Sequence, residues 1–212
     1  AFVRPSPAAG TLGGVARATM EAVILCEAAG YNRVIVETVG VGQSETSVRE
    51  MVDVFTLLLI GGAGDEVQGI KRGIVEMADV IVVHKADGDR IDSCIKTAQA
   101  YSNALHLFPM PDGGEVVEVL TASSTTGAGH NEVRDQIEKL NKTWHKSGFF
   151  LTKRSNQQSD RMLSHAKDIL FDKTMCEPNS KSNWENLSNE VTSKNQSAFA
   201  AAWAWVHKNN GT

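Results

Sequence analysis

The chain has 212 residues, of which 42% are hydrophobic and 22% charged, with a formal net charge of −4 at pH 7. This length and composition are those of a globular protein with one ordinary domain and an appendage. The slight negative charge gives no reason to expect nucleic acid or an anionic membrane as the partner. The longest apolar run, residues 54–60, is too short to cross a bilayer, and no signal peptide is visible.

Short runs of Val, Ile and Leu alternate with helix-like segments along the first part of the chain. The expected strands are residues 34–37, 54–60, 80–83 and 116–120. Their apolar character is continuous, as in strands buried on both faces of a parallel sheet. The expected helices cover residues 19–30 and 66–77, a segment with Ile91, Ile95, Ala98, Ser102 and Leu105 on one face, and a segment with Val133, Ile137, Leu140 and Trp144 on one face. This order predicts an α/β fold with a mostly parallel sheet flanked by helices.

The composition changes near residue 151, so we expect a domain over residues 1–150 and an extension over 151–212. The extension begins with an amphipathic helix that carries Met162, Leu163, Ile169 and Leu170. Residues 176–197 are rich in Asn, Ser and Lys, which predicts a linker or disordered stretch. The last apolar segment, residues 198–206, predicts a short helix with Phe199, Trp203 and Val206 on its packing face.

The first run ends in an acidic residue followed by glycines, in the sequence "VIVETVGVGQSE". A carboxylate at a strand end, here Glu37, can hold Mg²⁺ through water, and Gly40 would let its N–H approach a terminal phosphate. The partner motif of such a site, G-x-x-x-x-G-K-[ST], does not occur in these 212 residues. Taken alone, E-x-x-G is equally compatible with an ordinary strand-to-turn junction.

The third run leads into "VVHKADGD", which matches the spacing of the guanine-recognition motif [NT]-K-x-D. A carboxylate at Asp87 would accept hydrogen bonds from the ring N–H and the exocyclic amine of guanine, whereas adenine would leave it unpaired. The Lys85 stem would lie along the base. His84 stands where the motif has Asn or Thr, and an imidazole N–H can still donate. The alternative is a polar loop after a strand.

The fourth run leads into "LTASSTTGAG", where Ser123 and Ser124 would place backbone N–H groups near the guanine oxygen. This loop is common by itself. The order of the three motifs, each after its own strand, favours a guanine-nucleotide protein, because ligands bind at the carboxyl ends of strands in such sheets.

Residues 3–45, 51–87 and 121–129 closely resemble the MeaB/ArgK family of metallochaperone-type GTPases, and the resemblance covers about residues 2–150. It implies a P-loop GTPase fold, GTP or GDP with Mg²⁺ as ligands, and a homodimer that binds methylmalonyl-CoA mutase and gates its B12 cofactor. Glu37 and Gly40 would then serve Mg²⁺ and the γ-phosphate, and Gln43 would orient water. The segment 64–73, with Asp65, Glu66, Gln68 and Lys71, resembles the family's switch, although it also suits the start of a surface helix.

Family members carry the P-loop before a segment like "RPSP", which here begins at Arg4, and the chain begins with Ala1 rather than Met. We therefore expect the distal part of such a protein, which alone hydrolyses GTP negligibly. The alternative function is a nucleotide-free module that binds the mutase or a twin subunit. Three isolated cysteines without C-x-x-C indicate an intracellular, reduced protein. The compartment expected is the mitochondrial matrix for a eukaryotic source and the cytoplasm for a bacterial one.

A zinc hydrolase and a dinucleotide-binding dehydrogenase fit the sequence poorly. The six histidines show no metal-ligand spacing such as H-E-x-x-H. No G-x-G-x-x-G opens a helix after a strand.

Overall fold

The structure is a computed structural model that describes residues 1–5, 12–38, 44–61 and 72–209 of the chain. The chain forms two compact units, Ala1–Arg154 and Ser155–Thr212. In the described part, no helix has both the length and the apolar character that crossing a bilayer requires.

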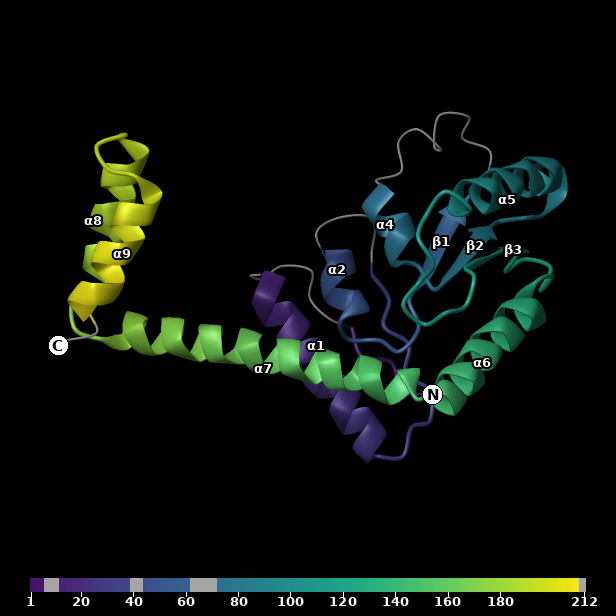
Figure 1. The fold of residues 1–212 in the computed structure, drawn as a ribbon, viewed down its shortest axis with the longest axis horizontal. Coiled ribbons are helices and arrows are strands. Elements are labelled where there is room, and N and C mark those ends of the chain that lie inside the picture. Colours follow the sequence, from purple (N-terminus) through teal and green to yellow (C-terminus); the bar gives the residue numbers. More distant parts are fainter. Residues whose placement is uncertain (6–11, 39–43, 62–71, 210–212) are drawn as a thin grey trace. The chain divides into compact units, whose positions relative to one another are not determined.

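A parallel three-stranded sheet organises the first unit, in the order β1 (Thr56–Ile60), β2 (Val80–His84) and β3 (Glu118–Ala122). The register pairs Ile60 with His84 and His84 with Ala122, so all three strands end at the same level. Among the described residues of this unit, Figure 1 labels the helices α1 (Leu12–Ala28), α2 (Ser44–Arg49), α4 (Arg72–Met77), α5 (Ile91–Leu105) and α6 (His130–Ser147). A short 3-10 helix, η1 (Gly88–Arg90), precedes α5. The loops that leave β2 and β3 therefore start side by side.

The central strand β2 is buried on both faces because successive side chains point to opposite sides of a strand. Ile81 belongs to a cluster with residues of β1, α2, α4 and α5. Val80 and Val82 belong to a second cluster, with Leu140 and Trp144 of α6. The helix face expected from Leu140 and Trp144 is confirmed, and the sheet is covered by helices on both sides.

The strand expected at residues 34–37 does not form. The side chain of Ile35 is 92% exposed, and only Val36 of this stretch packs against a core cluster. The described strands pair only as β1–β2 and β2–β3, so no neighbouring strand takes up the backbone groups of this stretch. Its apolar residues are typical of a strand, but the pairing partner decides whether a strand forms.

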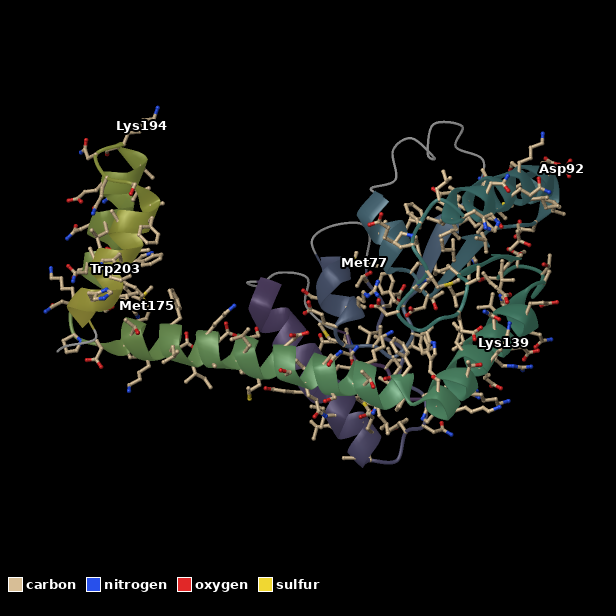
Figure 2. The ribbon with its side chains drawn as sticks, in the orientation of Figure 1. Met77, Asp92, Lys139, Met175, Lys194 and Trp203 are labelled. Carbon is tan, nitrogen blue, oxygen red and sulfur yellow. The ribbon has the colours of Figure 1, made fainter. Side chains whose placement is uncertain are left out.

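The packing face of α5 differs in part from the expected one, although Leu105 packs against the first cluster as expected. Cys94 and Tyr101, two turns apart, are buried, whereas Ile91 and Ile95 remain exposed. A Cβ at Gly61 would lie 2.5 Å from the Cys94 sulfur, so the end of β1 leaves room only for a small side chain on this face of α5. Ile91 and Ile95 lie on either side of Cys94 in the sequence and take no part in its close approach to Gly61. Asp92 lies in the first turn of the same helix (Figure 2).

The first turns of α7 (Phe149–Cys176) are bonded to the strand starts of the first unit. Lys153 Nζ donates to the Asp53 carbonyl at 2.6 Å and to Asp79 Oδ2 at 3.1 Å. The N–H of Phe55 donates to the same Asp79 oxygen at 2.8 Å. These bonds link the beginning of α7 to the residues that precede β1 and β2.

The second unit contains the rest of α7 with α8 (Ser180–Thr192) and α9 (Ala198–Asn209). The linker or disordered stretch expected at residues 176–197 is wrong for most of its length, because α8 occupies it. Trp184, Leu187 and Val191 share one side of α8 and line an apolar hollow with Ala201 and Trp205 of α9. Three apolar residues at helical spacing are the signal for α8, and the ring of Trp184 contacts that of Trp205 in α9.

The face expected for α9 is wrong as well. Ala201 and Trp205 are buried, whereas Phe199 is 77% exposed and Trp203 also lies at the surface (Figure 2). Trp205 Nε1 donates to the Ser180 carbonyl at 3.1 Å. Alanine lets α8 and α9 approach closely, and the indole N–H of Trp205 finds an acceptor there. Packing against α8 therefore buries Ala201 and Trp205 rather than the expected face of Phe199, Trp203 and Val206.

Candidate functional site

The loops after β2 and β3 are joined by a hydrogen bond between two residues of the expected guanine site. Ser123 Oγ donates to Asp87 Oδ2, and Ser123 is fully buried, with 0% exposed surface. Because parallel strands end at one edge of the sheet, residues 36 positions apart in the sequence meet here. The serine hydroxyl fixes the orientation of the carboxylate.

The loop after β3 is closed around the same hydroxyl. Ser123 Oγ accepts the N–H groups of Thr125 and Thr126, each at 3.2 Å. The Ser123 N–H donates to the Ala128 carbonyl at 2.9 Å, and the Gly127 N–H donates to the Ser123 carbonyl at 2.9 Å. Gly129 then starts α6 with φ +78°. The loop is thus a compact turn between strand and helix.

The loop after β2 is tied to its neighbour at two further points. His84 Nε2 and Ser124 Oγ are hydrogen-bonded at 2.8 Å. The Ala86 N–H donates to the Ala122 carbonyl at 3.0 Å. Between them, Lys85 is exposed and has φ +61°, in the left-handed region that residues with a Cβ rarely adopt. The exposed ammonium group can reach a ligand in front of the sheet edge.

The structure brings together one group of the expected site residues, namely His84, Lys85, Asp87, Ser123 and Ser124. Glu37 is exposed and follows a stretch outside the sheet. Gly40 and Gln43 lie outside the described residues, as do Asp65, Glu66, Gln68 and Lys71 of the expected switch segment. The roles assigned to all of these residues stay predictions.

The group formed by Asp87 and its neighbours fits a guanine base. Asp87 is half-buried, and within the described residues its only side-chain hydrogen bond is the one from Ser123 to Oδ2. Oδ1 and the second lone pair of Oδ2 can accept the two parallel donors of guanine. Among the described residues, no three His, Cys, Asp or Glu side chains gather as a metal cluster. A magnesium ion held by one carboxylate and by nucleotide phosphates needs no such cluster.

Sequence reasoning missed Cys94 of α5, whose side chain contacts the backbone of the loop after β2. Cys94 Sγ donates to the carbonyls of His84 and Lys85, at 3.8 and 3.7 Å. The sequence shows Cys94 only as one of three isolated cysteines. Its spacing of seven residues from Tyr101 is the signal that could have placed it on the buried face of α5.

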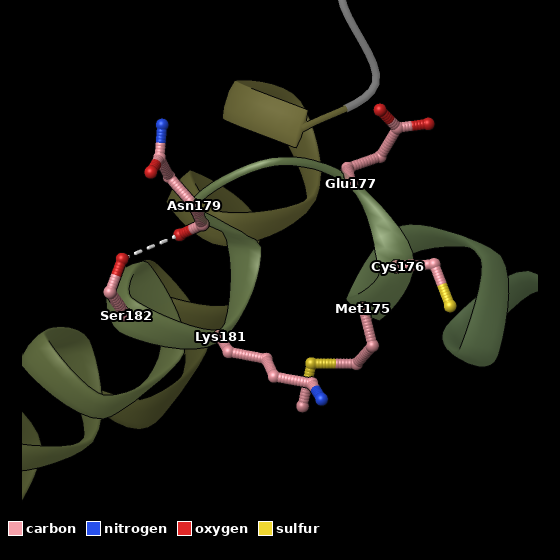
Figure 3. A pocket seen from close by; sticks show the side chains of 6 residues that line it. All are labelled: Met175, Cys176, Glu177, Asn179, Lys181 and Ser182. Carbon is pink, nitrogen blue, oxygen red and sulfur yellow. Dashed lines mark hydrogen bonds between the residues drawn. The ribbon is translucent and has the colours of Figure 1, made fainter.

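The second unit has a hollow that is separate from this site. It measures about 530 Å³ and lies in the second unit, where α7 ends and α8 begins. Figure 3 shows its lining residues, among them Ser182, whose hydroxyl donates to the Asn179 carbonyl at 2.9 Å. None of the expected nucleotide-binding residues lines it. The candidate site is instead an open edge of the sheet.

Comparison with known proteins supports the resemblance drawn from the motifs. GTPase ArgK of Escherichia coli is 48% identical over 133 residues, which cover 63% of this chain and 40% of that protein. The mitochondrial methylmalonic aciduria type A homolog of Mus musculus is 46% identical over 157 residues, covering 74% and 38%. The chain spans about half the length of the curated relatives it matches, with 52% and 53% in two bacterial cases.

A solved structure has the same fold. It is described as the crystal structure of LAO/AO transport system kinase, with a TM-score of 0.74 and 32% identity, covering 96% of this chain and 64% of that one. The predicted fold class, a parallel sheet flanked by helices, is thereby confirmed. The family model described as "Methylmalonyl Co-A mutase-associated GTPase MeaB" matches residues 1–179. With most of its length covered by that match, this chain belongs to the MeaB family.

Proposed function

We propose that the protein containing this chain binds GTP and GDP, hydrolyses GTP, and acts on adenosylcobalamin-dependent methylmalonyl-CoA mutase as a chaperone of its B12 cofactor. The observation that carries the nucleotide part is the hydrogen bond from Ser123 to the Asp87 carboxylate at the carboxyl edge of β2 and β3. Family membership and the names of the relatives support the GTPase activity. The family description supports the mutase as partner.

In this proposal, Asp87 selects guanine. Its carboxylate accepts the ring N–H and the exocyclic amine, and the Ser123 hydroxyl keeps it turned toward the base. Lys85 places its aliphatic stem along the base plane, and its ammonium reaches the ring oxygen of the ribose. The loop that starts at Ser123 offers backbone N–H groups to the guanine oxygen. His84 and Ser124, which bond to each other, fix the spacing between the two loops.

The phosphate side of the site is assigned to residues before β1. Glu37 is exposed and would hold Mg²⁺, which supplies positive charge against the phosphate oxygens. Gly40 would donate its N–H to the γ-phosphate, and Gln43 would orient the attacking water. These assignments rest on the sequence motif.

A second copy of the chain is proposed as a further partner. The α7 helix carries Met162, Leu163, Ile169 and Leu170, each more than half exposed. Covering this stripe would remove apolar surface from water, and the family resemblance implies a homodimer. Light scattering on the purified protein tests this part, since a monomer at micromolar concentration contradicts it.

We propose the mitochondrial matrix as the compartment for a eukaryotic source, as the name of the mouse relative suggests, and the cytoplasm for a bacterial source.

Replacement of Asp87 by Asn in the protein from the complete reading frame tests the base assignment. Xanthine carries an oxygen where guanine carries its amine, so an amide at position 87 should favour xanthosine triphosphate over GTP. Asp89→Asn is the matched control, because Asp89 is an exposed acidic residue two positions away. Equal preference for GTP in both variants would rule out Asp87 as the base reader. A wild-type protein that binds no nucleotide but still binds the mutase would support the interaction module instead.

A further inference from the structure

The buried thiol of Cys94 contacts the backbone of the proposed base-reading loop. Cys94 is 0% exposed and lies in the first turn of α5. Its sulfur is 3.8 Å from the His84 carbonyl oxygen and 3.7 Å from that of Lys85, both within reach of an S–H donor. A thiol is a weak donor, and the two carbonyls belong to the last residue of β2 and to the residue that follows it. One side chain thus supports two successive peptide groups.

The loop that receives these contacts is held in an unfavourable conformation. Lys85 has φ +61°, and a non-glycine residue in the left-handed region costs about 1–2 kcal/mol. Such a conformation persists only where neighbouring groups hold it. Three groups do so here: the Cys94 thiol behind the loop, the Ala122 carbonyl beside it, and the Ser123 hydroxyl at its end.

The space around Cys94 explains why a small side chain stands there. A Cβ at Gly61 would approach the Cys94 sulfur to 2.5 Å and its Cα to 2.8 Å. Gly61, which follows β1 directly, therefore lies against α5. A larger residue at position 94 would push the helix away from the sheet, whereas alanine or serine fits.

We propose that Cys94 is a positioning residue for guanine recognition: its thiol holds residues 84–87 in the conformation that presents Lys85 and Asp87 to the base. This inference rests on the proposed function, because it assumes that the loop binds guanine. The thiol does not touch the nucleotide. Its effect is on the fraction of molecules in which Asp87 can accept the exocyclic amine of guanine. Molecules outside that fraction bind GDP and IDP alike, so the advantage of GDP over IDP falls with that fraction.

The test is equilibrium binding of GDP and IDP to the protein from the complete reading frame, by competition against a fluorescent GDP analogue. Inosine lacks the exocyclic amine, so the ratio of the two affinities reports how well Asp87 is placed. In C94A the donor is lost, and we expect GDP affinity to fall about two- to tenfold, with a lower GDP-to-IDP ratio. In C94S a hydroxyl replaces the thiol, and both quantities should return to within about twofold of wild type. Cys26→Ala is the control and should change neither.

A role in general stability would lower the melting temperature without changing the GDP-to-IDP ratio. Wild-type binding of GDP together with an unchanged ratio in C94A would overturn the inference and leave the proposed function intact. Failure of the wild-type protein to bind GDP would overturn both.

A second measurement avoids the variants, in case C94A does not fold. The rate of Cys94 alkylation by iodoacetamide is followed by mass spectrometry in the wild-type protein, with exposed Cys176 as the internal reference. At equal saturation, GDP should slow the reaction of Cys94 more than IDP does. Equal protection by the two nucleotides would overturn the inference.

Discussion

Arg154 binds Asp53 through two parallel hydrogen bonds, from Nε to Oδ1 and from Nη2 to Oδ2, each 2.7 Å long. Nη2 also donates to Glu27 Oε1 at 2.8 Å. The three residues come from α7, from the residues before β1, and from the end of α1. One guanidinium group therefore connects three segments that are far apart in the sequence.

Replacing Arg154 by Ala should lower the free energy of unfolding by about 1 kcal/mol. A bidentate, charge-assisted pair is stronger than an ordinary surface pair, but Arg154 is 37% exposed and Asp53 31%, so solvent screens much of it. Urea unfolding measures the change. Arg134→Ala is the control, because in the described structure the side-chain hydrogen bonds of exposed Arg134 go to its sequence neighbour Asp135. A loss in R154A no larger than in R134A would show that the connection has no stabilising effect.

The contribution of Arg154 should not vary with pH near neutrality. Hydrogen bonding to Asp53 raises the pKa of Arg154, against an opposing effect of burial. A group whose pKa is higher in the folded state stabilises fully below its unfolded pKa and loses that effect only as pH rises through the folded value. For arginine both values lie far above neutral. The difference in unfolding free energy between wild type and R154A should be constant from about pH 7 to 10, and a steady decline over that range would contradict the assignment.

Gly129→Ala should destabilise the protein severely, by about 3 kcal/mol or more. A Cβ there would lie 2.0 Å from the Thr121 carbonyl oxygen and 2.9 Å from the Ala122 Cα, and neither backbone atom can move without disturbing β3. Gly148→Ala is a matched control, since φ is +80° there but nothing lies within 4 Å of the added carbon. It should cost only the conformational strain, about 1 kcal/mol. Similar melting temperatures for the two variants would argue against the close approach at Gly129.

Ser123→Ala should weaken GDP binding more than Ser124→Ala. The buried hydroxyl of Ser123 donates to Asp87 and accepts two backbone N–H groups, so its removal leaves several polar groups without partners. Such losses cost about 1–3 kcal/mol, or up to about a hundredfold in affinity if borne by the bound state. Ser124 is exposed and bonds only to His84 in the described structure. Calorimetric titration with GDP compares the two, and equal affinities would show that Ser123 serves folding alone.

Sequence reasoning located β1, β2 and β3 to within two residues and placed Asp87 and Ser123 at one edge. It succeeded there because continuous apolar runs identify buried parallel strands, and parallel strands carry their following loops to the same side. Long-range contacts do not leave such a pattern. The sequence could not show that Cys94 must be small because Gly61 approaches it.

The predicted faces of α5 and α9 were partly or wholly wrong for a related reason, whereas that of α6 was confirmed. Hydrophobicity favoured Ile91 and Ile95 in α5 and Phe199 and Trp203 in α9, yet these residues are exposed. The neighbouring element decides which residues fit, and in both helices the buried face includes a small residue that allows close approach. In α8 the polar composition concealed the few apolar residues that face α9. Pattern alone thus identifies helices more reliably than their contacts.

At Lys85, the requirement for backbone stability and the requirement for a cationic side chain favour different residues. Glycine adopts φ +61° without penalty, so a screen for heat resistance alone should enrich Lys85→Gly. The same change would remove the long cationic side chain from the edge of the sheet. Under the proposed function, a lysine at a backbone angle that suits glycine is an example of stability given up for ligand binding.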